Sequence, residues 1–236
     1  MYSFKCIVFL LTFSLGQSSP LPSHDSNSPS CSHHFIENLP MQSSAWKVLL
    51  ESGRFAPVQD KTDHHMKRLR HKLAELVAII DFHMEKYSQD VFGDSFRQIE
   101  KELGDLQYPA VIPAGSEILS DNTYQVSSES SLIEAYSIFQ RLALSLEIVT
   151  TDLQHHQHAT NRMWRASSHT VSNILRNIYT ELVMKGVNIP APLTRDIIPQ
   201  SMRCLPFSAY RDTRDFIILR HLMQAAQFYS QLLEVE

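Results

Sequence analysis

A group of histidines is the feature of this sequence with the clearest potential for chemistry. His155, His156 and His158 lie close together, and His169 follows about three turns into the next expected helix. Imidazole nitrogens are good ligands for zinc and copper. Adjacent histidines do not easily face one ion on a regular helix, however, and no carboxylate stands beside them to orient the rings. We therefore expect a hydrated loop between two helices and no metal site.

Other catalytic signatures are absent from the sequence. It has no Gly-x-Ser-x-Gly, His-Glu-x-x-His or Cys-x-x-Cys motif, and its 6 glycines leave little material for a phosphate-binding loop or a turn-dense all-β fold. The 21 Lys and Arg against 25 Asp and Glu give a net charge of −4, which argues against a nucleic-acid binder held by phosphate contacts. We expect no enzyme, no cofactor and no nucleic-acid partner.

The first residues have the layout of a secretory signal. Lys5 precedes the apolar run at 6–13, and the small residues Ser14 and Gly16 follow it. The run is too short to anchor the chain across ~30 Å of hydrocarbon, and charges interrupt every later apolar stretch. We expect a signal peptide at residues 1–18 and a mature protein that is secreted and not embedded in a membrane. The alternative is a buried N-terminal strand or helix.

Export would place two cysteines, Cys31 and Cys204, in an oxidising compartment, because Cys6 leaves with the signal. Two such thiols usually pair, and a loop this long stabilises by roughly 4 to 5 kcal/mol in the chain-entropy model. We expect a Cys31–Cys204 disulfide. Alternatively, Cys31, which lies in the leader at 19–60, is free or pairs between molecules.

Helices are expected in the long windows that contain no proline. Four segments carry apolar residues at the three- and four-residue spacing of an amphipathic helix, with Trp164 expected in the core. Ser131-x-x-Glu134 is one candidate capping box for the second, and Gly186 stands where a left-handed residue would end the third. A short helix within 94–106 is a further expectation. The four segments are 62–87, 132–153, 164–183 and 216–233.

Four helices of about six turns each predict an all-α fold, a four-helix bundle within residues 61–236. The short link at 155–159 demands antiparallel neighbours. The connections at about 88–128 and 187–206 are long enough to run the length of a bundle, which permits parallel pairs. The predicted topology is therefore up-up-down-down with two long crossovers, and connections this long are often functional.

Three segments of the sequence resemble the interleukin-6-type long-chain four-helix cytokines, in the branch of ciliary neurotrophic factor, cardiotrophin-like cytokine and leukemia inhibitory factor. Residues 132–139 (Leu-Ile-Glu-Ala-Tyr-Ser-Ile-Phe) resemble the Glu-Ala-Tyr segment that opens helix B in this branch. Residues 215–224 resemble the matching stretch of helix D. Residues 61–73, with Lys-Thr and then Leu-x-His-x-Leu, are similar to the opening of helix A.

The resemblance implies a secreted growth factor that acts by binding and catalyses nothing. Its partners would be cytokine receptor ectodomains, namely the family's shared signal-transducing chain and the leukemia inhibitory factor receptor chain, while the need for a non-signalling α receptor stays open. A monomeric ligand would hold these ectodomains together. Kinases attached to their cytoplasmic parts would then activate one another and start JAK/STAT signalling.

One receptor surface of the family uses exposed faces of helices A and C, and the matching positions here are basic. The pattern of the helices also predicts that these side chains face solvent, where their charge could steer association with acidic receptor surfaces. A plain solvated face is the alternative interpretation. The residues are Lys67, Arg70, His71, Arg165, His169 and Arg176.

The family's surface for the leukemia inhibitory factor receptor chain has a Phe-x-x-Lys motif at the start of helix D, and this sequence departs from it. The nearest residues are Phe207 and Arg211, four apart instead of three, with Tyr210 between them. At this spacing an aromatic and an arginine share one helical face and can form an interface hot spot. The alternative is that Phe207 simply caps the bundle.

A secreted helical carrier of a small apolar ligand is the alternative function. Bundle interiors can hold such ligands, and the sequence does not separate a filled core from a hollow one. Large residues at nearly every apolar position of the helices favour a filled core, and with it the cytokine interpretation.

Overall fold

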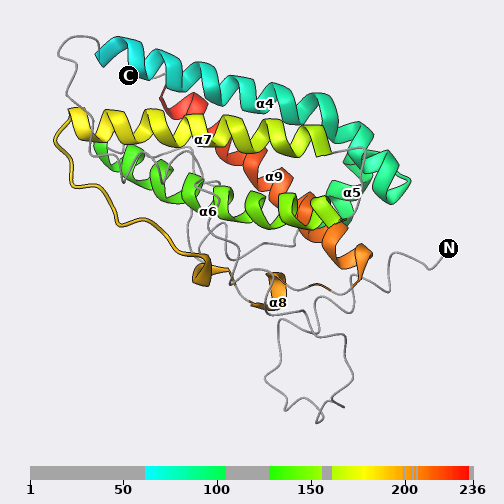
Figure 1. Ribbon diagram of the computed structural model, residues 1–236. Helices are drawn as coiled ribbons and strands as arrows, with labels where there is room; N and C mark the ends of the chain where they lie inside the picture. Colours follow the sequence, from blue (N-terminus) through cyan, green and yellow to red (C-terminus); the bar gives the residue numbers. More distant parts are fainter. Residues whose placement is uncertain are drawn as a thin grey trace.

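The computed structural model describes residues 62–104, 128–155, 161–198, 200–203, 205 and 207–233, and this part of the chain is all-helical (Figure 1). Its four long helices lie where the apolar periodicity predicts them. They are α4 (Thr62–Phe92), α6 (Ser128–His155), α7 (Asn161–Met184) and α9 (Ser208–Leu232). The shorter elements are α5 (Phe96–Leu103), the 3-10 helix η2 (Arg195–Ile197) and α8 (Gln200–Arg203).

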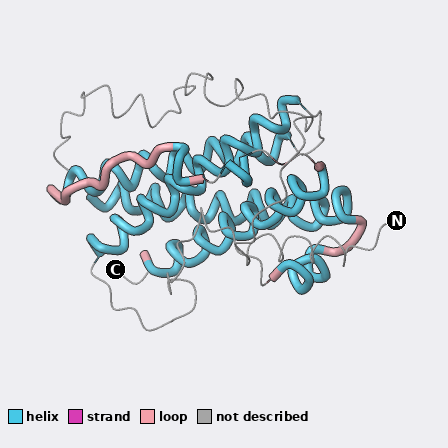
Figure 2. Tube along the Cα trace, turned by 90° about the horizontal axis from the view of Figure 1, so that it is seen from below, coloured by secondary structure: helices cyan, strands magenta, loops and turns pink. Residues whose placement is uncertain are grey.

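The long helices pack around one shared core. Helices α4 and α6 each contact both α7 and α9, and α5 packs against α4. Figure 2 shows the same helices from a second direction, with the long rods side by side. The buried apolar residues of all four form a single cluster.

Turn geometry explains where two of these helices end. Gly93 and Gly186 both have positive φ, at 75° and 67°, which is the left-handed conformation that favours glycine. Gly186 therefore ends α7 as the sequence predicts, whereas α4 continues beyond the expected residue 87 to Phe92. The proposed capping box at Ser131 is wrong, because α6 begins three residues earlier, at Ser128, and Ser131 is buried inside the helix.

Large aromatic side chains fill the core. Trp164, Phe139 and Phe216 are fully buried, which confirms the prediction for Trp164. The Tyr87 ring meets Trp164 edge-on at 5.9 Å between centroids, and Phe92 meets Phe216 in the same way at 5.7 Å. These edge-to-face pairs join α4 to α7 and α4 to α9, and each adds about 0.5 to 1.5 kcal/mol beyond the area it buries.

Helix α9 is buried around most of its circumference between residues 213 and 222, although its sequence predicts one apolar side. Two arginines there have partners inside the protein. Arg214 pairs with Asp215 at 2.7 Å and donates to the Met202 carbonyl of α8 at 3.2 Å. Arg220 donates to the Leu103 carbonyl at the end of α5 at 2.8 Å. Buried arginines therefore tie α5 and α8 to α9.

His221, also in this part of α9, gives the fold a dependence on acid. The side chain is buried, its Nδ1 has no hydrogen-bond partner within the described residues, and burial together with the Arg220 charge lowers its pKa from 6.5 to about 4. Between these two pH values the unfolded chain binds a proton that the folded chain does not. Stability is therefore lost as the pH falls from 6.5 towards 4, by up to about 3 kcal/mol from this residue.

The His221→Met variant should remove this loss. Urea unfolding between pH 7 and pH 4 is expected to show a smaller fall in the free energy of unfolding for the variant than for the wild type. The exposed His71 supplies a matched control, since the His71→Met variant should retain the wild-type pH dependence. An unchanged slope for His221→Met would contradict the assignment.

Candidate functional site

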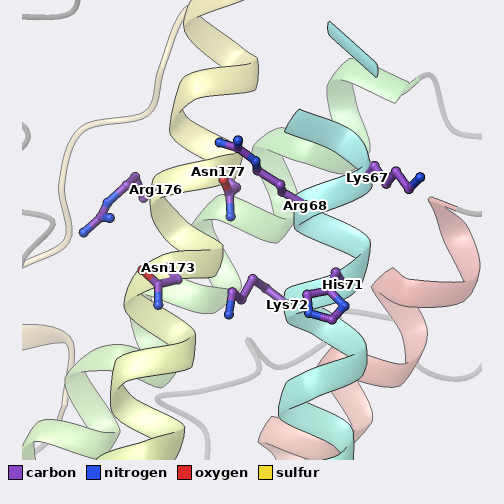
Figure 3. A pocket seen from close by; sticks show the side chains of 7 residues that line it. All are labelled: Lys67, Arg68, His71, Lys72, Asn173, Arg176 and Asn177. Atoms are coloured by element: carbon purple, nitrogen blue, oxygen red, sulfur yellow. The ribbon is translucent and has the colours of Figure 1, made fainter. Parts of the chain in front are cut away.

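Three of the predicted basic residues border one groove between α4 and α7. Lys67 and His71 lie on an exposed face of α4, and Arg176 is exposed on α7. The groove has a volume of about 510 Å³ and is shown in Figure 3. Its described lining residues are Lys67, Arg68, His71, Lys72, Asn173, Arg176 and Asn177.

Helical spacing explains how the groove is built. Arg68 and Lys72 are four residues apart, so both extend from the same face of α4 towards α7 (Figure 3). Asn173 and Asn177 have the same spacing and lie opposite them on α7. A pair of cations therefore faces a pair of amides across the groove.

The groove is strongly positive, although the whole chain carries a net charge of −4. Its described lining includes two lysines, two arginines and a histidine, and none of these lining residues is a carboxylate. Lys72 pairs with Glu75 one turn further along α4, outside the lining. The other cations leave a local excess of positive charge, which raises the local concentration of anions.

The remaining residues predicted for this surface lie outside the groove. Arg165 and His169 are exposed on α7, about 16 and 10 Å along the helix from Arg176 at 1.5 Å per residue. Arg70 is half-buried, and its Nε is buried without a hydrogen-bond partner in the described part of the chain. It is therefore less available to a partner than the helical pattern predicts.

Glu181 lies on α7 one turn beyond Asn177 and is buried. Neither carboxylate oxygen has a hydrogen-bond partner within the described residues. Burial raises the pKa of this carboxyl, while Lys185 and His65 act in the opposite direction. Folding therefore shifts this carboxyl towards its neutral form, and the stability that this group contributes at low pH is lost as the pH rises through its pKa.

The Glu181→Gln variant should be more stable than the wild type at pH 7, by about 1 kcal/mol, because it removes an unpartnered buried charge. The difference in stability between the variant and the wild type should narrow as the pH falls towards 4, because the acid then becomes neutral in both the folded and the unfolded chain. Thermal unfolding of both proteins at pH 7 and at pH 4 measures this difference. Asp81→Asn, an exposed change of the same charge on α4, is the control and should have no such effect. A Glu181→Gln variant that is less stable at pH 7 would show that the carboxylate is needed.

The second predicted surface contains a pair of aromatic side chains at the start of α9. Phe207 directly precedes the helix in an extended conformation, and its side chain is 64% exposed. The ring of the half-buried Tyr210 packs against it edge-on, with 5.8 Å between centroids. This exposure does not support the alternative that Phe207 caps the bundle. A large apolar ring in water is a common feature of protein interfaces.

The sequence predicts that Arg211 shares a binding face with Phe207, but in the structure its guanidinium has a partner within the protein. It is half-buried, and its Nη1 donates to the Leu205 carbonyl at 3.0 Å. The guanidinium thus fixes the segment that leads into α9, as Arg214 fixes α8. A change at Arg211 would break this side-chain hydrogen bond, whereas the hydrogen bonds of Phe207 are accepted by its backbone carbonyl and do not depend on its side chain.

Comparisons with protein-family models, with curated proteins and with solved structures find no match. Function therefore has to be inferred from this chain's own residues and geometry. The features available for this are the basic groove between α4 and α7 and the aromatic pair at the start of α9.

The histidine group and the cysteines lie largely outside the described residues. His155 is the last residue of α6, while His156, His158, Cys31 and Cys204 are not described. Among the residues that are described, no three or more His, Cys, Asp or Glu side chains are grouped to hold a metal ion.

The same part of the chain holds no helix whose length and apolarity would let it cross a bilayer. The expected signal peptide and leader, 1–60, also fall outside it.

Proposed function

We propose that this protein is a secreted helical cytokine of the interleukin-6 type. It would join the family's shared signal-transducing chain to the leukemia inhibitory factor receptor chain, and so start JAK/STAT signalling. The observation that carries the proposal is the way the long helices are arranged, because long-chain cytokines are bundles with two long crossovers.

The contacts and directions of the helices support an up-up-down-down bundle. In Figure 1 the colours run one way along α4 and α6 and the other way along α7 and α9. Each helix contacts mainly the two that run opposite to it. The link at 156–160 is short, as an antiparallel pair requires, and those at 93–127 and 185–207 are long enough to return along helices of this length.

The two candidate surfaces support a ligand for two different receptor chains. The basic groove lies near the start of α4, and the Phe207 pair lies at the start of α9, towards opposite ends of the bundle in Figure 1. Two receptor chains could therefore bind without competing for one patch. The groove offers charge for steering and the aromatic pair offers an apolar anchor.

A carrier of a small apolar ligand is less well supported. Such a carrier needs a hollow apolar interior, whereas Trp164, Tyr229, Phe139 and Phe216 are all fully buried where the long helices meet. The groove described above is lined by polar and charged residues. Its chemistry suits anions and not lipids.

Binding to purified receptor ectodomains tests the proposal. The mature protein should bind the shared signal-transducing chain or the leukemia inhibitory factor receptor chain in a panel of soluble cytokine-receptor ectodomains, and should cause phosphorylation of the downstream transcription activators in cells that carry both. Failure to bind any ectodomain would contradict the cytokine function. A stoichiometric apolar ligand, found by mass spectrometry of an organic extract, would favour the carrier instead.

A further inference from the structure

We propose that the groove between α4 and α7 binds the sulfate groups of a sulfated polysaccharide. The inference rests on the proposed function in one respect, the export of the protein, because sulfated polysaccharides are polyanions of the cell surface and the extracellular space. Everything else in it depends on the groove itself.

The lining of the groove has the chemistry that an oxyanion requires. A sulfate group offers several acceptor oxygens and one negative charge. Arg68 can donate two parallel hydrogen bonds to such a group, and Lys72, although it pairs with Glu75, offers further N–H donors on the same side. Asn173 and Asn177 can donate amide N–H groups from across the groove.

The size and openness of the groove suit a short stretch of a polymer. A volume of about 510 Å³ falls in the range of sites for small ligands, so it has room for a sulfated disaccharide unit. Lys67 and Arg176 point outwards on opposite sides of it (Figure 3). In these positions they can meet further sulfate groups as the chain continues past the groove.

The described lining favours a polysaccharide over a nucleic acid. No Phe, Tyr or Trp is among these residues, so the groove offers no large aromatic ring on which bases can stack. The two lysines and two arginines of the lining supply the positive charge that a polyanion requires. The expected binding is electrostatic and weakens as salt is added.

The groove overlaps the predicted receptor surface without coinciding with it. Lys67, His71 and Arg176 belong to both. The pairs that face each other, Arg68 and Lys72 on α4 and Asn173 and Asn177 on α7, belong to the groove alone. Variants of these four residues therefore test the groove specifically.

The first test removes charge from the groove. Binding of the full-length mature protein to immobilised heparin should weaken about tenfold in the Arg68→Ser/Lys72→Ser variant, and the slope of log affinity against log salt should fall by roughly 2. The control variant, Lys86→Ser/Lys101→Ser, removes the same charge from exposed positions elsewhere and should bind within about twofold of the wild type. Equal weakening in the two variants would overturn the proposal, since net charge alone would then explain binding.

The second test leaves the charge unchanged. The Asn173→Leu/Asn177→Leu variant should weaken heparin binding about threefold with no change in the salt slope, because only amide donors are lost. Circular dichroism and thermal unfolding confirm that each variant is folded. Unchanged binding in this variant, or equal binding to chemically desulfated heparin, would overturn the proposal. Tighter binding to single-stranded DNA or to an acidic peptide than to heparin would overturn it too.

These measurements use purified protein without receptors, so they separate this inference from the proposed function. If the protein binds heparin through the groove but binds no receptor ectodomain, the proposed cytokine function is contradicted and the polysaccharide site is supported. If the protein binds receptors but not heparin, the polysaccharide site is contradicted and the cytokine function is supported.

Discussion

Replacing Phe207 with alanine is expected to lower signalling potency by about 10- to 30-fold in cells that carry the receptor chains. Exposed aromatic anchors that become buried in an interface commonly contribute 2 kcal/mol or more to binding. The fold should not suffer, because the Phe207 side chain is 64% exposed and its ring contact is with Tyr210 at the surface. Dose–response curves for phosphorylation of the transcription activators measure the potency, and thermal unfolding measures the stability.

Phe82 provides the control for this experiment. It is a phenylalanine of α4 whose side chain is 80% exposed, so Phe82→Ala removes the same ring from a different face. That variant should keep its potency within about twofold. Full potency of Phe207→Ala, or an equal loss in both variants, would show that the start of α9 is not a receptor contact.

Arg211 is a less clean test of the same surface. Replacing both Phe207 and Arg211 with alanine is expected to abolish signalling, but the second change also removes the hydrogen bond from Arg211 to the Leu205 carbonyl. A loss of about 1 kcal/mol of stability is expected from that bond alone. The single Phe207 change therefore isolates the interface from the fold.

The long helices could be predicted from the sequence because one physical property determines them. Apolar residues spaced three and four apart must face a common core, and Leu69, Leu73, Leu76 and Ile80 of α4 are all buried as that spacing requires. Gly186 ends α7 for an equally local reason, its left-handed backbone. Local signals of this kind do not depend on which helices become neighbours.

The central position of α9 could not be predicted, because it depends on tertiary packing. Arg214 and Asp215 precede the predicted segment 216–233 and His221 lies away from its apolar side, yet all three are buried. Polar residues are buried when partners for them come from elsewhere in the fold, such as the Met202 carbonyl for Arg214. A helical pattern contains no information about such partners.

Only part of the groove's lining coincides with residues predicted from the sequence for a receptor surface, for the same reason. Helical spacing places Lys67 and His71 on one face of α4, and both line the groove. Asn173 and Asn177 have no charge to mark them in a sequence, and they gain significance because α7 packs beside α4 opposite Arg68 and Lys72. The signal that would have found them is the four-residue spacing within each pair, combined with knowledge of which helices are neighbours.

The Asp215→Asn variant is expected to lower the free energy of unfolding by about 3 kcal/mol. The Arg214 and Asp215 side chains are only 1% and 8% exposed, so the substitution removes a buried carboxylate that pairs with the guanidinium. The effect should lie at the lower end of the usual range because Arg214 keeps its bond to the Met202 carbonyl. Urea unfolding at pH 7 measures it.

An exposed ion pair and a double variant show whether burial is the cause. Glu75→Gln breaks the pair with Lys72 at the surface of α4 and should change stability by less than about 1 kcal/mol. The Arg214→Met/Asp215→Leu variant removes both buried charges and should recover much of the lost stability, since apolar side chains of similar volume often replace a buried pair well. The stability that this double variant does not recover measures how much the link from α9 to α8 contributes to the free energy of unfolding. If Asp215→Asn were as mild as Glu75→Gln, the pair would be accessible to water and α9 would not be the buried helix on which the short helices are fixed.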